Sequence, residues 1–157
     1  MKSWGKSLFS AFLALCCAFV GAHAAWIENG VPLTNQWGSV GGAVIASDGS
    51  SGAIIAYPVC RAGVSHIIAQ HVNSLGVVLW GDEGIDVCTA TGGQGSPTIT
   101  SDGAGGALVA WMEYRNESWD IYAQRVNASG TVQWSANGVA LCTATGGQDS
   151  PMITSDG

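Results

Sequence analysis

The chain repeats itself with a period of 54 residues. The stretch CTATGGQGSPTITSDG at Cys88–Gly103 returns as CTATGGQDSPMITSDG at Cys142–Gly157, with two of sixteen positions changed. Several columns keep one residue type in every copy, among them Trp26, Trp80 and Trp134; Gly30, Gly84 and Gly138; and Asp48, Asp102 and Asp156. Similarity at a fixed period of this length indicates a repeat architecture, and it constrains the fold more strongly than any local motif.

Each repeat predicts short β-strands separated by turns. Asp102-Gly103 and the segment NASG at Asn127–Gly130 are hairpin signals, since Gly and Asn tolerate the positive φ angles of tight turns. The second copy therefore predicts a four-stranded antiparallel meander. Its strands are expected at Ser96–Ser101, Ala107–Tyr114, Asp120–Val126 and Thr131–Trp134, with a short extra strand at Val139–Cys142 and a glycine turn at Gly146-Gly147.

The second strand of each meander is apolar on both faces. In ALVAWMEY the alternate positions Leu108 and Ala110 are as apolar as Val109 and Trp111, so both sides of the sheet need cover. Face-to-face stacking of small four-stranded sheets, as in a β-propeller, provides that cover. A sandwich would not require strict spacing, and the coils of a β-solenoid are usually shorter. Pro58 interrupts the pattern of the first copy and predicts a bulge there.

At these residues a family resemblance is visible. The pattern DGAGGALVAWMEYRNESWDIYAQRVNASGTVQW resembles the tandem repeats of large secreted bacterial proteins that are taken to form β-propellers. The resemblance covers residues 26–157 and is strongest at Asp102-Gly103, Trp111, Asp120–Val126 and Trp134. The first copy departs from it at Tyr57 and His66, as terminal repeats often do. It implies a repeat type and a fold, not an activity.

The N-terminus reads as a secretory signal. Lys2 and Lys6 precede an apolar run, and Ala22-His23-Ala24 supplies small residues for cleavage. We expect a signal-peptide helix at 1–24, blades at 25–79 and 80–133, and part of a third at 134–157. Because a propeller ring has typically four to eight blades, we also expect an incomplete propeller and a longer protein; the alternative is a complete short protein that builds its ring from several chains. Export would place it outside the cell, on the cell surface or in the periplasm.

Charge and cysteine usage narrow the partners. Residues 25–157 hold three arginines against all eleven acidic residues, a net charge near −8. An acidic chain without lysine repels phosphate backbones, so we expect no nucleic-acid partner, and nothing after Trp26 is apolar enough to cross a bilayer. Cys60, Cys88 and Cys142 are widely spaced and odd in number, which favours small buried side chains over a disulfide framework.

No residue set in the sequence amounts to a catalytic, cofactor or metal site. Asp48, Asp102 and Asp156 each offer one carboxylate beside glycine, which predicts a turn role rather than calcium binding. His66 and His71 would face opposite sides of a strand. Glu113, Glu117 and Asp120 form an acidic cluster that the first copy lacks, which favours a solvated loop over an acid pair.

One loop varies between copies and is the best candidate for binding. Only the arginine is common to RAGVS at 61–65 and RNESW at 115–119. Tyr114, Arg115, Trp119 and Asp120 would offer stacking and directional hydrogen bonds to a sugar or peptide, although Arg115 could instead tie the loop to a neighbouring blade. We therefore expect a non-catalytic binding or scaffolding protein with an unknown protein or carbohydrate ligand. The alternative is the N-terminal propeller part of an exported hydrolase with catalytic residues beyond Gly157.

Overall fold

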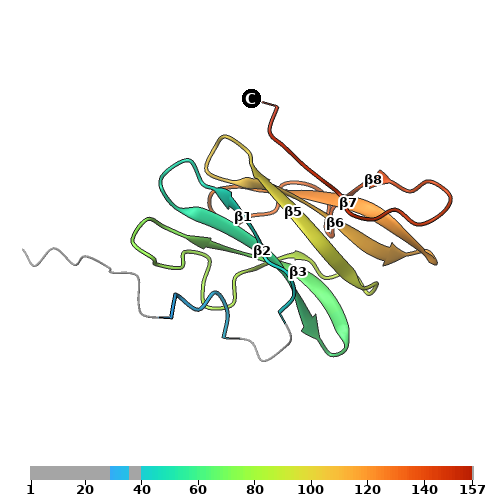
Figure 1. Ribbon diagram of the computed structural model, residues 1–157, viewed down its shortest axis with the longest axis horizontal. Helices are drawn as coiled ribbons and strands as arrows, with labels where there is room; N and C mark the ends of the chain where they lie inside the picture. The colour runs from blue at the N-terminus through green and yellow to red at the C-terminus, as the bar shows by residue number, and fades with distance from the viewer. Residues whose placement is uncertain (1–28, 36–39, 157) are drawn as a thin grey trace, which may run out of the picture.

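The computed structural model describes residues 29–35 and 40–156, and within them every regular element is a β-strand. The strands form two four-stranded antiparallel sheets, each a meander in chain order (Figure 1). The first sheet contains β1 (Val44–Ser47), β2 (Ala53–Arg61), β3 (Val64–Val72) and β4 (Ile85–Cys88). The second sheet contains β5 (Gln94–Ser101), β6 (Ala107–Arg115), β7 (Ser118–Val126) and β8 (Val139–Cys142).

The repeat of the sequence is a repeat of the structure. β2, β3 and β4 begin and end 54 residues before β6, β7 and β8, so equivalent residues occupy equivalent places in the two sheets. The expected all-β fold and four-stranded meanders are confirmed. The predicted signal peptide at 1–24 lies outside the described residues. No helix that could span a bilayer occurs in the described part of the chain.

The fourth strand of the second sheet is β8, and the strand expected at Thr131–Trp134 does not form. The chain starts to pair there, since Gln133 N donates to Arg125 O at 2.8 Å. The buried Gln124 side chain then takes over: its Oε1 accepts from Trp134 N at 2.9 Å, and its Nε2 donates to Ser135 O at 2.9 Å. Because a side chain occupies the backbone groups that a ladder would use, the chain leaves the sheet and returns to it at Val139.

Pro58 causes no bulge between β2 and β3, where the register is continuous from Ala53 to Arg61. Its carbonyl accepts from Gly41 N at 3.0 Å, so it faces the segment that precedes β1, which begins at Val44. The proline nitrogen points to that same side, so its missing hydrogen interrupts no ladder. The bulges lie elsewhere, in the pairing of β3 with β4, of β5 with β6 and of β7 with β8.

The main core lies between the two sheets, where β5 packs across β1, β2 and β3 (Figure 1). One face of each sheet contributes to it. The members from the first sheet and its connections are Ile54, Ala56, Ile67, Ala69, Trp80, Val87 and Cys88, and those from the second are Ala107, Val109, Trp111, Tyr122 and Val126. Stacking of this kind is what the apolar second strand predicts.

The outer face of the first sheet is also covered. Ile55, Tyr57 and Val59 of β2 form a second core with Leu33 from the preceding segment. The Tyr57 hydroxyl donates to Leu33 O at 3.2 Å, and burial raises the pKa of this phenol to about 12. The first sheet is thus closed on both sides, as the sequence predicts.

Two repeated glycines allow the chain to pass close under each sheet. Gly84 and Gly138 have φ angles of +73° and +82°, a region that L side chains rarely adopt. A Cβ atom at Gly138 would lie 2.7 Å from Ala123 O and 2.6 Å from the Trp111 ring. The glycine is therefore required for the chain to enter β8.

Candidate functional site

The variable loop is a tight hairpin rather than a flexible loop. β6 continues to Arg115 and β7 begins at Ser118, and these two residues are paired, which leaves a two-residue connection. Asn116 and Glu117 have φ angles of 51° and 65°, as the central residues of a type I′ turn require. We call residues 114–119 the aromatic hairpin, and its backbone is fixed by the strands on either side.

Tyr114 and Trp119 form an exposed aromatic pair across this hairpin. Their ring centroids are 5.4 Å apart with an interplanar angle of 62°, an edge-to-face arrangement. The two residues are 45% and 36% exposed. A shallow hollow of about 320 Å³ beside them is lined by Tyr114, Glu117, Ser118, Trp119, Gly146 and Gly147.

The neighbouring loop is tied to the aromatic hairpin. Ser118 Oγ donates to Gly146 O at 3.1 Å, and Gln148 N donates to Trp119 O at 2.7 Å. Gly146 has a φ of +94°, in agreement with the predicted glycine turn. Both walls of the hollow are consequently held by hydrogen bonds, and a ligand entering it would meet a surface that is already ordered.

Arg115 points inward rather than toward a ligand. Its Nε and Nη2 both lie 2.7 Å from Glu113 Oε1, and Nη2 donates to Asn137 O at 3.3 Å. The guanidinium carbon sits 3.9 Å from the centroid of the Tyr122 ring, in cation–π geometry. Arg115 therefore ties the aromatic hairpin to its own sheet.

Glu113 is fully buried at the centre of a hydrogen-bonded cluster between the sheets. Besides the Arg115 pair, its Oε2 accepts from Trp111 Nε1 at 3.0 Å and from Cys88 Sγ at 3.4 Å. Burial raises the pKa of Cys88 to about 12, and the charge of Glu113 adds to the shift. A thiol of that pKa is protonated at neutral pH and is no nucleophile.

The expectation of a solvated acidic loop is wrong for two of its three members. Glu113 is enclosed by donors, and Asp120 lies opposite it in the β6–β7 register and is also buried. The alternation of β7 places Asp120 on the same face as the core residue Tyr122. Of the four residues predicted to bind, the structure brings Tyr114 and Trp119 together at the surface. Arg115 instead binds the buried Glu113, and Asp120 is itself buried.

Two of the repeated aspartates, Asp48 and Asp102, form their turns as predicted, and they also have a partner that the sequence did not reveal. Asp102 Oδ1 accepts from Ala104 N and Gly106 N at 2.8 Å each, and Asp48 does the same for Ser50 N and Gly52 N at 2.7 and 2.8 Å. The second carboxylate oxygen binds the side chain at one repeat position of the third strand. That residue is His71 in the first sheet, at 2.9 Å, and Arg125 in the second, at 2.9–3.0 Å.

These contacts change the acidity of both carboxyl groups. The hydrogen bond from His71, with that from Ser50 N, lowers the pKa of Asp48. Burial alone would raise the pKa of Asp102, but the hydrogen bonds from Ala104, Gly106 and Arg125 together outweigh it and lower the pKa. Both aspartates are therefore held ionised as parts of the sheet, which leaves neither suited to proton transfer near neutral pH.

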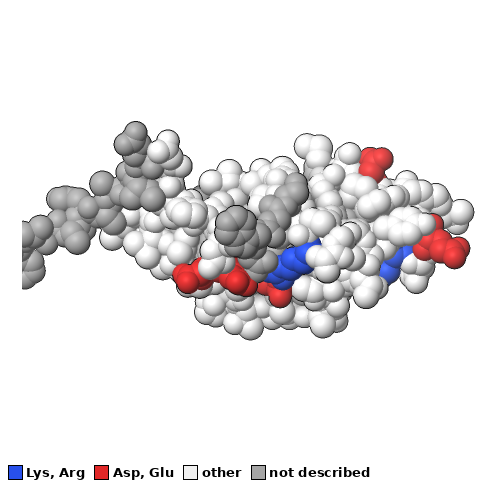
Figure 2. All heavy atoms as spheres, turned by 90° about the horizontal axis from the view of Figure 1, so that it is seen from below, with Lys and Arg blue, Asp and Glu red and all other residues white. Residues whose placement is uncertain are grey.

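The arginines of the described residues are all used within the protein. Each of the three arginines pairs with a carboxylate: Arg61 with Asp86 at 2.6 Å, Arg115 with Glu113 and Arg125 with Asp102. Figure 2 shows one face on which acidic and basic side chains gather in small mixed groups on a mostly uncharged surface. Within residues 29–35 and 40–156, no group of three or more His, Cys, Asp or Glu side chains could hold a metal ion.

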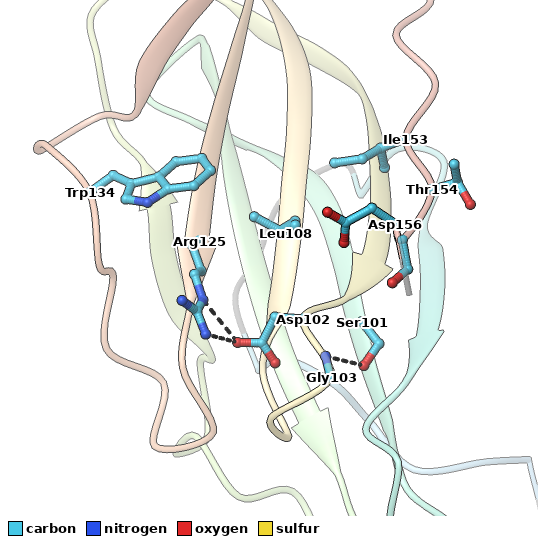
Figure 3. Close-up of a pocket in the computed structure, with 10 residues that line it drawn as sticks. Ser101, Asp102, Gly103, Leu108, Arg125, Trp134, Ile153, Thr154 and Asp156 are labelled. Atoms are coloured by element: carbon cyan, nitrogen blue, oxygen red, sulfur yellow. Dashed lines mark hydrogen bonds and ion pairs between the residues drawn. The ribbon is translucent and has the colours of Figure 1, made fainter.

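A larger hollow of about 510 Å³ lies on the outer face of the second sheet. Figure 3 shows Trp134 on one side of it, Ile153 on the other and Leu108 between them, with the Arg125–Asp102 pair below. No protein-family model, curated protein or solved structure matches the chain.

Proposed function

We propose that this chain is an exported, non-catalytic repeat protein in which each 54-residue copy forms one blade-like sheet of a β-propeller, and that it serves in binding or scaffolding. Its ligand is a sugar or a peptide held at the aromatic hairpin. The proposal of export rests on the N-terminal sequence, and the proposal of a propeller rests on the repeat together with the face-to-face stacking of the two sheets.

One observation carries the non-catalytic part of the proposal. Glu113, Cys88 and the turn aspartates Asp48 and Asp102 have structural partners: Glu113 binds Arg115, Trp111 and Cys88, while the aspartates bind His71 and Arg125. Groups fixed in this way stabilise the sheets and offer no base or nucleophile to a substrate.

The aromatic hairpin supplies the binding part. It is a segment in which the two copies share only the arginine, and its counterparts of Tyr114 and Trp119 in the first sheet are Cys60 and Ser65. An exposed aromatic pair on a rigid turn can stack on a sugar ring or pack on an apolar peptide side chain with little loss of side-chain freedom. Glu117 and the backbone of the Gly146 loop add polar contacts at the edge.

The test is a binding screen of the secreted protein against glycan and peptide arrays. We expect retention on a restricted set of ligands that Trp119→Ala weakens by about 10-fold or more. Trp134→Ala is the matched control, because that tryptophan is similarly exposed, at 39%, but lies on the outer face of the second sheet.

Two results would reject this function. One is silence on both arrays; the other is an equal loss of binding in the two tryptophan variants. Hydrolysis of an arrayed glycan or peptide by the protein itself would instead favour an exported hydrolase.

A further inference from the structure

The same repeat face is covered in the first sheet and open in the second. In the first sheet this face carries Trp80 and Val87, which are 8% and 1% exposed. Their equivalents 54 residues later are Trp134 and Leu141, at 39% and 58%. The contrast extends to the cysteines, since Cys88 is buried and Cys142 is exposed. We call this surface the docking face.

The second sheet covers the docking face of the first with identifiable contacts. Trp80 Nε1 donates to Ala128 O at 3.2 Å, in the turn between β7 and Thr131, and the indole packs so closely on Gly130 that a Cβ there would lie 3.0 Å from it. At the other end, Cys88 Sγ reaches Glu113 Oε2. The indole and the thiol are therefore two anchors between consecutive sheets.

The docking face of the second sheet exposes the equivalents of both anchors, Trp134 and Cys142. Trp134 borders the hollow of about 510 Å³ (Figure 3). Ile153 lies across that hollow from it, and Ile153 is the copy of Ile99, which packs into the core between the two sheets. Part of the first strand segment of the third copy, at Ile153, thus lies on this face of the second sheet. Its position corresponds to that of β5 on the first sheet.

We propose that the outer face of the second sheet is an interaction surface for a third sheet of the same 54-residue repeat, anchored by Trp134 and Cys142. The indole N–H donates to the carbonyl of that sheet's equivalent of Ala128, and Cys142 meets its equivalent of Glu113. This inference rests on the stacked-sheet architecture of the proposed function, and it names the contacts that continue the stack.

A second molecule of the chain as described does not offer the required sheet. The outer face of its first sheet is covered by Leu33 and Val78. The inner face of its second sheet is already packed on the first through Val109, Trp111 and Tyr122. Only an additional sheet can present the turn and the inner face that Trp134 and Cys142 require.

The experiment appends a copy of residues 104–142 directly after Gly157 of the full chain, with its final cysteine copied as serine. Because Gly157 is the equivalent of Gly103, this completes the third sheet in register. Two probes report on docking: the alkylation rate of each cysteine, read by peptide mass spectrometry, and hydrogen exchange of the Trp134 indole N–H.

We expect alkylation of Cys142 and exchange at Trp134 to slow by about 100-fold or more in the extended chain, to the level of Cys88 and Trp80. Cys60, which is exposed in the first sheet, should react equally in both proteins. Trp134→Ala in the extended chain should restore the reactivity of Cys142.

Unchanged Cys142 and Trp134 in the extended chain would overturn the inference. Failure of the added segment to become resistant to proteolysis would do the same, because an identical sequence folds as the second sheet. Binding at the aromatic hairpin is measured on the same two proteins. Absence of ligand binding from both proteins, with intact docking in the extended one, rejects the proposed function alone. Failed docking with intact binding rejects this inference alone.

Discussion

Replacement of Trp80 by alanine should weaken the packing between the two sheets and lower the free energy of unfolding. Trp134→Ala provides a control at the same repeat position. Trp80 fills the core between the sheets, donates to Ala128 O and packs edge-to-face on His71 with ring centroids 5.4 Å apart. Deletion of a buried tryptophan costs about 3–5 kcal/mol, through lost transfer free energy and the cavity that remains. The orphaned Ala128 carbonyl lies near the surface, where water replaces most of the lost hydrogen bond.

For Trp134→Ala we expect a cost of about 1 kcal/mol or less, because this side chain is over a third exposed and no hydrogen bond from its indole is found in the described residues. The two variants should thus differ by about 2–4 kcal/mol, or roughly 30- to 1000-fold in the folding equilibrium constant.

Urea unfolding followed by circular dichroism measures this difference. With a slope of about 1–3 kcal/mol per molar urea, the midpoint of Trp80→Ala should fall by about 0.7–4 M relative to that of Trp134→Ala. Equal midpoints for the two variants would refute the assignment of Trp80 as the anchor between the sheets.

Three further perturbations test the local arguments. Gly138→Ala should destabilise the protein by about 2 kcal/mol or more, through strain at positive φ and a clash with Ala123 O, as read by thermal unfolding; a neutral result would contradict the geometry. The lowered pKa values of Asp48 and Asp102 imply stability that is present above an unfolded pKa of about 3.9 and is lost as pH falls through the folded values. Urea titrations from pH 6 to pH 2 should show this loss, and Asp102→Asn should flatten the profile unless its pairing is irrelevant to folding. Native alkylation at pH 8 should label Cys60 and Cys142 before Cys88, and Glu113→Gln should leave Cys88 buried and slow, because burial is the main cause of its raised pKa; rapid labelling of Cys88 would show that the sheets open.

The sequence predicted the elements that depend on local patterns. Strand positions follow from alternation and turn residues, so β6 and β8 were placed within a residue of their observed bounds. The turn role of Asp102 followed from the Asp-Gly pair. Two-sided burial of the second strand likewise followed from its apolar residues on both faces, which is a property of the strand alone.

Features that depend on contacts between strands could not be predicted from local sequence patterns. The displacement of the fourth strand is caused by Gln124, whose recurrence in both copies was visible but whose partners were not. Likewise, Glu113 reads as a loop acid until β4 brings Cys88 to it and β6 brings Trp111. The alternation of β7 was the signal that could have placed Asp120 inside the sheet, since it is two residues from Tyr122.

The glutamine that replaces a stretch of backbone pairing has a consequence for how such repeats can change. The side chains of Gln70 and Gln124 each accept from the backbone N–H of the tryptophan ten residues later. Each thereby ends the backbone pairing at the point where the chain leaves the sheet. The excursion from Ser135 to Gly138 is held at its start by that side chain and at its end by a glycine, and between them Asn137 accepts from Thr89 N and from Arg115 Nη2. Because this bend contacts both sheets, a residue inserted into it would pull Asn137 away from those donors, which gives a physical reason for two successive copies to keep the same length.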